Sequence, residues 1–291
     1  MYHKGGTKVK IAILTMFNSL NQTYSLVNVV AEQLKMLLKN NLSVKLLVSE
    51  DCSDSQRKGI YADERIEWVK VTNRFEGERI KWYDYTQPEG EVHPNFFKEA
   101  NKIAEDFTKK LADVDVCLMH DIHYQGWHLI HNVAIRKAQK ELPDVKFVAF
   151  THSFPQNRPQ QLEWPFSARY ISMPNTIYVY PTRSGIPALA QQYNIPEGKC
   201  RVVNNSLNLL ENMSKLTKSI AREHNMFAAD ILIVYPGRFT TGKKFEKVAA
   251  FAGRMKTATE VNVKVIFCNF QSSDIDLKRY KGIIINTGKR F

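Results

Sequence analysis

The sequence lacks the features that mark secreted and membrane-spanning proteins. Its four cysteines lie far apart with no C-x-x-C pair, which disfavours a disulfide framework or a structural zinc site. No apolar run approaches the roughly 20 residues that are needed to cross a bilayer. The polar, basic N-terminus "MYHKGGTKVK" does not resemble a signal peptide. We therefore expect a cytoplasmic protein, with attachment to the surface of a membrane as an alternative.

The chain also lacks an arginine-rich arm and an aromatic RNA-binding signature, although its formal net charge is +12. A basic chain tends to bind something acidic: nucleic acid, an anionic membrane surface or a phosphorylated ligand. Here Lys and Arg are spread along the chain and mixed with Asp and Glu. This distribution disfavours nucleic acid, but charge alone does not choose the partner.

Apolar runs and amphipathic stretches alternate along the first two thirds of the chain. Continuous apolar runs are typical of buried parallel strands, and apolar residues three and four positions apart are typical of helices. The strands are expected at 9–17, 43–50, 66–71, 115–122, 145–153, 175–182 and 199–206, and the helices at 26–38, 95–111 and 127–141. This order predicts a doubly wound α/β domain over residues 1–206.

A linker with a helix is expected at 207–230, and the alternation then begins again. The second set is a strand at 231–235, a helix at 244–256, a strand at 263–270 and a last strand, "GIIIN", at 282–286. We expect a second Rossmann-like domain over residues 231–291 that is only partial.

One loop of this second region, "VYPGRFTTGKK" (234–244), comes close to a P-loop. Gly237 is followed after four residues by Gly242 and Lys243, but Lys244 stands where a P-loop needs Ser or Thr to hold magnesium. No acidic residue closes a later strand to complete such a metal site. A P-loop phosphotransferase is therefore the weaker interpretation.

The same loop fits another way of holding phosphate. It joins the carboxyl end of a strand to a helix, the place where open α/β sheets bind ligands and where helix N–H groups attract anions. Arg238 leaves the strand and Lys243 enters the helix, so both cations can converge on one pyrophosphate. The alternative is that these residues are ordinary solvent-exposed cations at the start of a helix, with no ligand.

The segment "VYPGRFTTGKKFEKVAAFAGRMK" (234–256) resembles the strand, loop and helix that open the donor domain of retaining GT-B glycosyltransferases. Residues 237–239 stand for the G-R-L of that family, and Lys243 has the expected spacing, while Lys244 replaces the usual glycine. The resemblance implies that Arg238 and Lys243 hold the diphosphate of a nucleotide sugar and stabilise its charge as the sugar departs.

Two earlier segments resemble the same family. Residues 115–155 are similar to a block of the acceptor domain in which a second strand ends in T-H, and His152 matches the active-site histidine of the family. "CRVVNNSLN" (200–208) is similar to V-I-P-N-G-V-D, with Asn205 at its asparagine. The resemblance thus implies a catalytic role for His152 and donor binding by Asn205 and Gly237.

The chain also departs from the family. Its first loop (15–25) has no paired glycines, and Ser206 and Asn208 replace the glycine and aspartate of the third motif. The E-x(7)-E segment that holds the donor sugar does not occur before Phe291. An exposed edge strand of a shortened sheet would be expected to seek a partner, either a completing subunit or a second copy of the chain.

Four histidines and an aspartate gather in "HDIHYQGWHLIH" (120–131), which suggests a metal site as an alternative. His128 and His131 are spaced to share a helix face, but no outlying ligand is evident. We expect no metal. His120 and Asp121 are predicted to line the cleft at the end of their strand.

The leading hypothesis is a GT-B glycosyltransferase that moves a sugar from a nucleotide-diphosphate sugar to an unidentified hydroxyl acceptor, with no further cofactor. The resemblance implies a retaining, metal-independent reaction in which His152, Arg238 and Lys243 are catalytic. The first alternative is a non-catalytic or partner-dependent GT-B-derived module that binds nucleotide or glycan.

Overall fold

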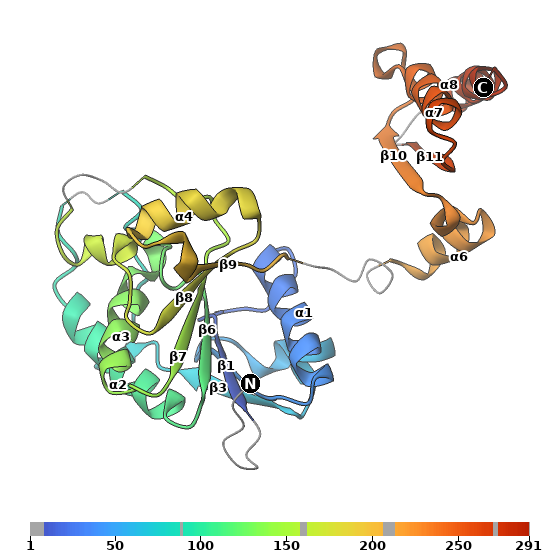
Figure 1. The fold of residues 1–291 in the computed structure, drawn as a ribbon. Coiled ribbons are helices and arrows are strands. Elements are labelled where there is room, and N and C mark those ends of the chain that lie inside the picture. Colours follow the sequence, from blue (N-terminus) through green and yellow to red (C-terminus); the bar gives the residue numbers. More distant parts are fainter. Residues whose placement is uncertain (1–8, 88–89, 158–161, 206–212, 270–272, 291) are drawn as a thin grey trace. The chain divides into compact units, whose positions relative to one another are not determined.

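The computed structural model describes residues 9–87, 90–157, 162–205, 213–269 and 273–290 (Figure 1). The chain separates into two compact units, Met1–Leu207 and Asn208–Phe291. The predicted domain boundary at 206 and the motif positions Ser206 and Asn208 lie outside the described residues. Across those ranges, no helix has both the length and the apolar character that a membrane span requires.

A parallel sheet of seven strands forms the centre of the first unit, in the order β3-β2-β1-β6-β7-β8-β9. The strands are β1 Lys10–Leu14, β2 Ser43–Ser49, β3 Ile66–Val71, β6 Val116–His120, β7 Lys146–Phe150, β8 Thr176–Tyr180 and β9 Cys200–Val202. The order reverses between β1 and β6, as in doubly wound folds. The predicted α/β, Rossmann-like fold of this part is confirmed.

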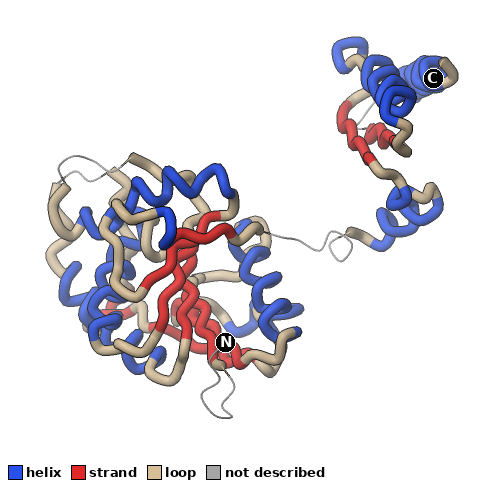
Figure 2. The backbone as a smooth tube through the Cα atoms, viewed as in Figure 1, coloured by secondary structure: helices blue, strands red, loops and turns tan. Residues whose placement is uncertain are grey.

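Helices cover both faces of this sheet (Figures 1 and 2). Within β1, Ile11 and Ile13 belong to the core under α1 (Ser25–Lys39), whereas Ala12 and Leu14 belong to the core on the other face. This second core is built with α2 Phe96–Leu111, α3 Leu129–Lys140 and α4 Ile186–Tyr193. A short antiparallel hairpin, β4 Arg74–Phe75 and β5 Glu78–Arg79, lies outside the main sheet. Burial on both faces explains why the strands are almost continuously apolar.

The second unit contains a β-α-β arrangement. Its elements are α6 Lys215–Glu223, β10 Ile231–Gly237, α7 Phe245–Thr259, β11 Val263–Asn269 and α8 Asp274–Gly288. β10 and β11 pair in parallel, as the alternation predicted. The buried side chains of this unit include three aromatic residues that form one cluster, Phe239, Phe245 and Tyr280.

The predicted last strand, 282–286, is wrong, because these residues lie inside α8. The side chain of Ser273 caps this helix by accepting the N–H of Asp276, and acidic residues in the first turn complement the helix dipole. Ile283 and Ile284 pack against the aromatic cluster one turn beyond Tyr280. A short run of isoleucine fits a strand and a buried helix equally well. The cap at Ser273 is therefore the feature that favours a helix here.

Candidate functional site

The carboxyl ends of β1, β6 and β7 meet at one edge of the first unit's sheet, where the strand order reverses. Ligands of open α/β sheets bind at this position. Two residues that follow these strands, Met16 and Asp121, have φ angles of 52° and 58°, in the left-handed region that non-glycine residues seldom adopt. The chain therefore turns sharply after β1 and after β6, although neither turn contains the glycine that would adopt this conformation most readily.

His120 and His152, from neighbouring strand ends, lie against each other. Nδ1 of His120 and Nε2 of His152 are 2.9 Å apart, so one ring donates a hydrogen bond to the other. The two rings are stacked with centroids 5.2 Å apart, and Phe150 stacks on His120 at 4.7 Å. Burial lowers the pKa of His152 to about 4 and that of His120 well below its usual value, which the neighbouring His152 lowers further. Both rings are therefore neutral at pH 7.

Each ring nitrogen outside this contact has a different environment. Nε2 of His120 is buried and has no hydrogen-bond partner among the described residues. His152 is only partly buried, and no hydrogen bond from its Nδ1 to the described chain is present. The His152 ring can therefore offer Nδ1 to a ligand at this edge, while His120 holds the ring in place.

Asp121 fixes the turn that carries His152. Its Oδ1 accepts the backbone N–H of His152 at 3.0 Å, and its own N–H donates to the carbonyl of Phe150. The carboxyl group is buried, and this burial raises its pKa to about 6. The carboxylate also contributes, after burial, to raising the pKa of Tyr24 to about 12. His120, Asp121 and His152 thus lie together at one edge of the sheet, a grouping that the sequence did not predict.

A pocket of about 240 Å³ opens beside the carboxyl end of β1. Its walls carry the half-exposed rings of Tyr24 and Trp127, with Trp82 and Phe17 also lining it. Exposed aromatic faces suit a sugar ring or another partly apolar ring. The sequence did not predict this pocket, since Trp82 lies in a polar stretch without periodicity. An isolated tryptophan in such a stretch was the available signal.

The remaining histidines of the 120–131 segment are buried, and one of them, His128, also lines the pocket beside β1. His128 and His131 are buried, with their Nδ1 atoms 3.0 Å apart, and Trp82 packs edge-on against His131. His123 is buried and lies 3.2 Å from the carbonyl oxygen of Ile171. No group of three or more His, Cys, Asp or Glu side chains in the part that the structure describes is placed to hold a metal ion.

The phosphate-binding loop predicted in the second unit runs from Gly237, the last residue of β10, to Lys244, which precedes α7. Gly237 has a φ of 157°, and the side chain of Lys243 lies 3.8 Å from the position that a Cβ would take there. Lys244 has a φ of 52° and a ψ of 42°, so it occupies a left-handed position of the kind that glycine favours. Lysine thus stands where the family pattern has glycine, at an energetic cost.

Aromatic residues hold this loop. The hydroxyl of Tyr235 donates to the carbonyl of Lys243 at 2.8 Å, and the hydroxyl of Tyr280 donates to Oγ1 of Thr241 at 3.0 Å. Phe239, inside the loop, is buried against the rest of the aromatic cluster. The loop is therefore fixed by side chains from β10 and α8.

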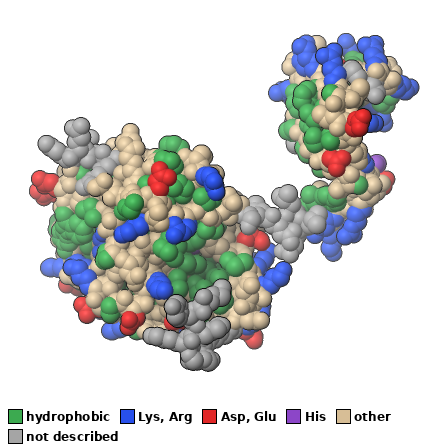
Figure 3. Space-filling view, viewed as in Figure 1, with side chains coloured by type: hydrophobic (Ala, Val, Ile, Leu, Met, Phe, Trp, Pro, Cys, Tyr) green, Lys and Arg blue, Asp and Glu red, His purple; other side chains and the backbone are tan. Residues whose placement is uncertain are grey.

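The cations of this loop are exposed. Arg238 and Lys243 form no ion pair with a carboxylate within the described ranges. The second unit has 15 Lys and Arg against 7 Asp and Glu, and Figure 3 shows basic side chains over much of its visible surface. The N-terminus of α7 presents helix N–H groups, which attract an anion.

Asn205, the remaining predicted donor-binding residue, is exposed and follows β9. It lies two strands beyond β7 in the sheet order, so the structure does not place it beside His152. The predicted site residues thus form one group at the β6 and β7 ends of the first unit and another in the loop of the second.

No family model and no curated protein matches the sequence. One similar solved structure is that of HepE from Anabaena in complex with UDP-glucose. It aligns with 96% of this chain at 9% identity and a TM-score of 0.44. UDP-GlcNAc 2-epimerase from Neisseria meningitidis bound to UDP-GlcNAc aligns with 96% of this chain at 13% identity and a TM-score of 0.40. The trehalose-6-phosphate synthase OtsA aligns with 97% of this chain at 11% identity and a TM-score of 0.45. This chain covers 66%, 69% and 69% of those proteins respectively.

Proposed function

We propose that this chain is a cytoplasmic glycosyltransferase that binds a nucleotide-diphosphate sugar through the 237–244 loop. The observation that carries the proposal is the loop itself. Arg238 and Lys243 are exposed and have no carboxylate partner among the described residues. Arg238 follows the parallel strand β10, and Lys243 ends the 3₁₀ turn Thr241–Lys243 that precedes the helix α7. This combination of two exposed cations and helix N–H groups suits a pyrophosphate.

The same loop suits the chemistry of sugar transfer. When the bond between the sugar and the diphosphate breaks, negative charge grows on the leaving phosphate oxygen. Fixed cations therefore bind the transition state more tightly than the ground state. The fork of Arg238 would contact two oxygens, and Lys243 would supply a point charge. Anchoring by Tyr235 and Tyr280 keeps the loop ready for this charge without rearrangement.

The first unit would bind the acceptor. The aromatic pocket beside β1 offers Trp82, Trp127 and Tyr24 to a sugar ring, and His152 would contact the donor sugar or its phosphate. A neutral His152 can accept or donate one hydrogen bond through Nδ1 without adding charge. Retention at the anomeric carbon and metal independence are the parts of this proposal that rest on the family resemblance alone.

A partner-dependent module is the second candidate. Within the described residues, β10 and β11 pair only with each other, and Ile231, Leu232 and Val234 of β10 are exposed. A two-stranded sheet with exposed apolar side chains is marginal by itself and would gain stability from a covering partner. This module would hold the nucleotide but would not turn it over alone.

Turnover by the purified chain separates the two candidates. The chain would be incubated with UDP-, GDP- and ADP-sugars, with water taking the sugar in place of the unidentified acceptor, and release of the nucleoside diphosphate would be measured with and without EDTA. The enzyme proposal predicts release that EDTA does not change and that His152→Ala lowers by about 100-fold, as for a group that acts in the transition state. Binding without release supports the module, and release that EDTA abolishes contradicts the metal-independent reaction.

A further inference from the structure

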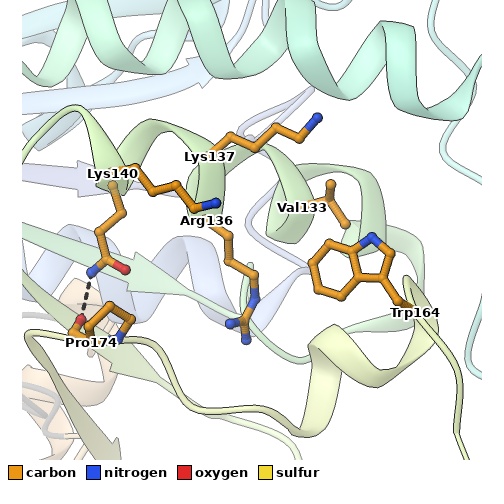
Figure 4. A pocket seen from close by; sticks show the side chains of 7 residues that line it. Val133, Arg136, Lys137, Lys140, Trp164 and Pro174 are labelled. Atoms are coloured by element: carbon orange, nitrogen blue, oxygen red, sulfur yellow. Dashed lines mark hydrogen bonds between the residues drawn. The ribbon is translucent and has the colours of Figure 1, made fainter.

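A second pocket, of about 300 Å³, lies on the first unit between α3 and the segment that leads to β8 (Figure 4). Its lining is Val133, Arg136, Lys137, Gln139, Lys140, Trp164 and Pro174. Lys140 ends α3 and Pro174 precedes β8, so this pocket lies toward the amino edge of the sheet. His120 and His152 follow the opposite, carboxyl edge. The pocket is therefore separate from the proposed transfer site.

Among the described residues, the lining contains three cations and no acidic side chain. Lys137 reaches toward α2, where its Nζ donates to Oδ1 of Asn101. Lys140 is exposed, and no carboxylate of the described chain pairs with it or with Arg136. The pocket thus has an excess of positive charge that the protein itself does not neutralise.

Arg136 is held rigidly at the pocket wall. Its guanidinium donates to Oδ1 of Asn132 and to the carbonyl of Ala168, each at 2.7 Å, and to the carbonyls of Ile171 and Ser172. Burial lowers its pKa to about 10, which leaves the group charged at pH 7. Nη1 makes one bond, of 3.3 Å, so it retains a second proton to donate. A half-buried cation that no carboxylate of the described residues neutralises gains from an anion beside it.

An aromatic wall faces these cations. Trp164 is half exposed, at 50% of its surface, and Figure 4 shows its indole across the pocket from Arg136 and beside Val133. The end of the pocket at Pro174 is fixed, because Nε2 of Gln139 donates to the carbonyl of Pro174 at 2.7 Å. An indole face of this kind binds a planar or apolar ring by stacking.

We propose that this pocket binds a small phosphate ester that carries one ring, with the phosphate on Arg136 and Lys140 and the ring on Trp164. The size supports a small molecule, because the volume is at the lower end of the roughly 300–1,000 Å³ of ligand pockets. The charge supports a phosphate, since a dianion offsets more of the three cations than a carboxylate does.

Isothermal titration of the full chain tests the site with four probes: phenyl phosphate, inorganic phosphate, benzoate and benzyl alcohol. We expect phenyl phosphate to bind more tightly than each of the other three. Lys140→Gln should weaken phenyl phosphate and inorganic phosphate by about tenfold, as for a lost charge-assisted hydrogen bond. Trp164→Leu should weaken phenyl phosphate by about fivefold and leave inorganic phosphate unchanged.

Lys199→Gln is the matched control, because Lys199 is an exposed lysine of the same unit outside the pocket. Arg136 is left in place, since it also holds backbone carbonyls. Absence of binding at millimolar phenyl phosphate overturns the proposal, as does an equal loss in Lys199→Gln and Lys140→Gln. Benzoate that binds as tightly as phenyl phosphate overturns the assignment to phosphate.

Discussion

Nδ1 of His120 lies 2.9 Å from Nε2 of His152, with the two rings stacked at the ends of neighbouring strands. A chain of contacts therefore runs from the buried end of β6 to a partly exposed imidazole at the edge of the sheet. His120 positions His152, and Asp121 holds the backbone of the same residue. His152, which the sequence matched to a family only through a T-H motif, is thus held by two neighbours that the motif does not contain.

Replacing Asp121 by Asn should change how stability depends on pH. Burial raises the pKa of Asp121 to about 6 in the folded chain, above its ordinary 3.8. Below pH 3.8 the protonated Asp121 carboxyl group therefore costs the folded state no stability. As the pH rises through 6 the group ionises in its buried position, and the free energy of unfolding falls. The Asn side chain tolerates the left-handed backbone and still accepts from His152.

The difference in free energy of unfolding, Asp121→Asn minus wild type, should grow by about 2 kcal/mol between pH 4 and pH 7. Urea unfolding at several pH values measures it. The histidines titrate in both proteins, so their contributions to the free energy of unfolding cancel in the difference. A difference that stays constant over this range would show that the carboxyl group is not buried as described.

Acid should destabilise the first unit through its buried histidines. Burial lowers the pKa of His128 to about 3 and that of His152 to about 4, below the ordinary 6.5. The stability linked to these neutral rings is full above pH 6.5 and is lost as the pH falls toward 4. Histidine ring signals in NMR spectra should therefore not shift between pH 7.5 and 5.5 for His128 and His152. A normal midpoint near 6.5 for either ring would contradict the packing.

Replacing Lys244 by Gly should stabilise the second unit. Lys244 has a φ of 52°, and the left-handed conformation costs a non-glycine residue roughly 1–2 kcal/mol. After the extra backbone entropy of glycine is subtracted, we expect a gain of about 0.5–1 kcal/mol in urea unfolding. Lys247→Gly, inside α7, removes the same charge and should instead destabilise by about 1 kcal/mol. Equal losses in both variants would mean that residue 244 is not left-handed.

Removing one hydroxyl should loosen the proposed phosphate loop. Tyr280→Phe deletes the bond to Thr241 and keeps the ring in the aromatic cluster, at a cost of about 1 kcal/mol in the unfolding of the second unit. Nucleotide binding should weaken as well, because the loop is less ordered. Tyr83→Phe, in the first unit, removes a tyrosine hydroxyl elsewhere as the control. Unchanged stability of Tyr280→Phe would show that the anchor is not formed.

Periodicity and strand-end position were sufficient to predict most of this fold. Buried strands on both faces of the sheet give long apolar runs, and α1 and α2 bury one stripe each, so both signals are local. The position of His120 and Asp121 at the end of their strand also followed from the sequence. Their contact with His152 did not, because it depends on β6 and β7 being neighbours in the sheet. The strand expected at 282–286 was wrong because the deciding information was the cap at Ser273.

Both pockets escaped prediction for another reason. Trp82 and His128 come together across 46 positions of chain, and Arg136 and Trp164 across 28. Contacts between such distant residues depend on how the loops fold over the sheet. The spacing of apolar residues along the chain carries no information about the paths of the loops. The left-handed conformation of Lys244 could be suspected only from the glycine of the resembling family.

The central claim is that Arg238 and Lys243 bind the diphosphate of a nucleotide sugar. The most direct measurement is isothermal titration of UDP, GDP and ADP into the wild type, Arg238→Ala and Arg254→Ala, an exposed arginine of α7 outside the loop. The proposal predicts that at least one nucleotide binds, that Arg238→Ala weakens it by about tenfold or more, and that Arg254→Ala leaves it unchanged. Equal affinity of the wild type and Arg238→Ala, with both proteins folded, would contradict it.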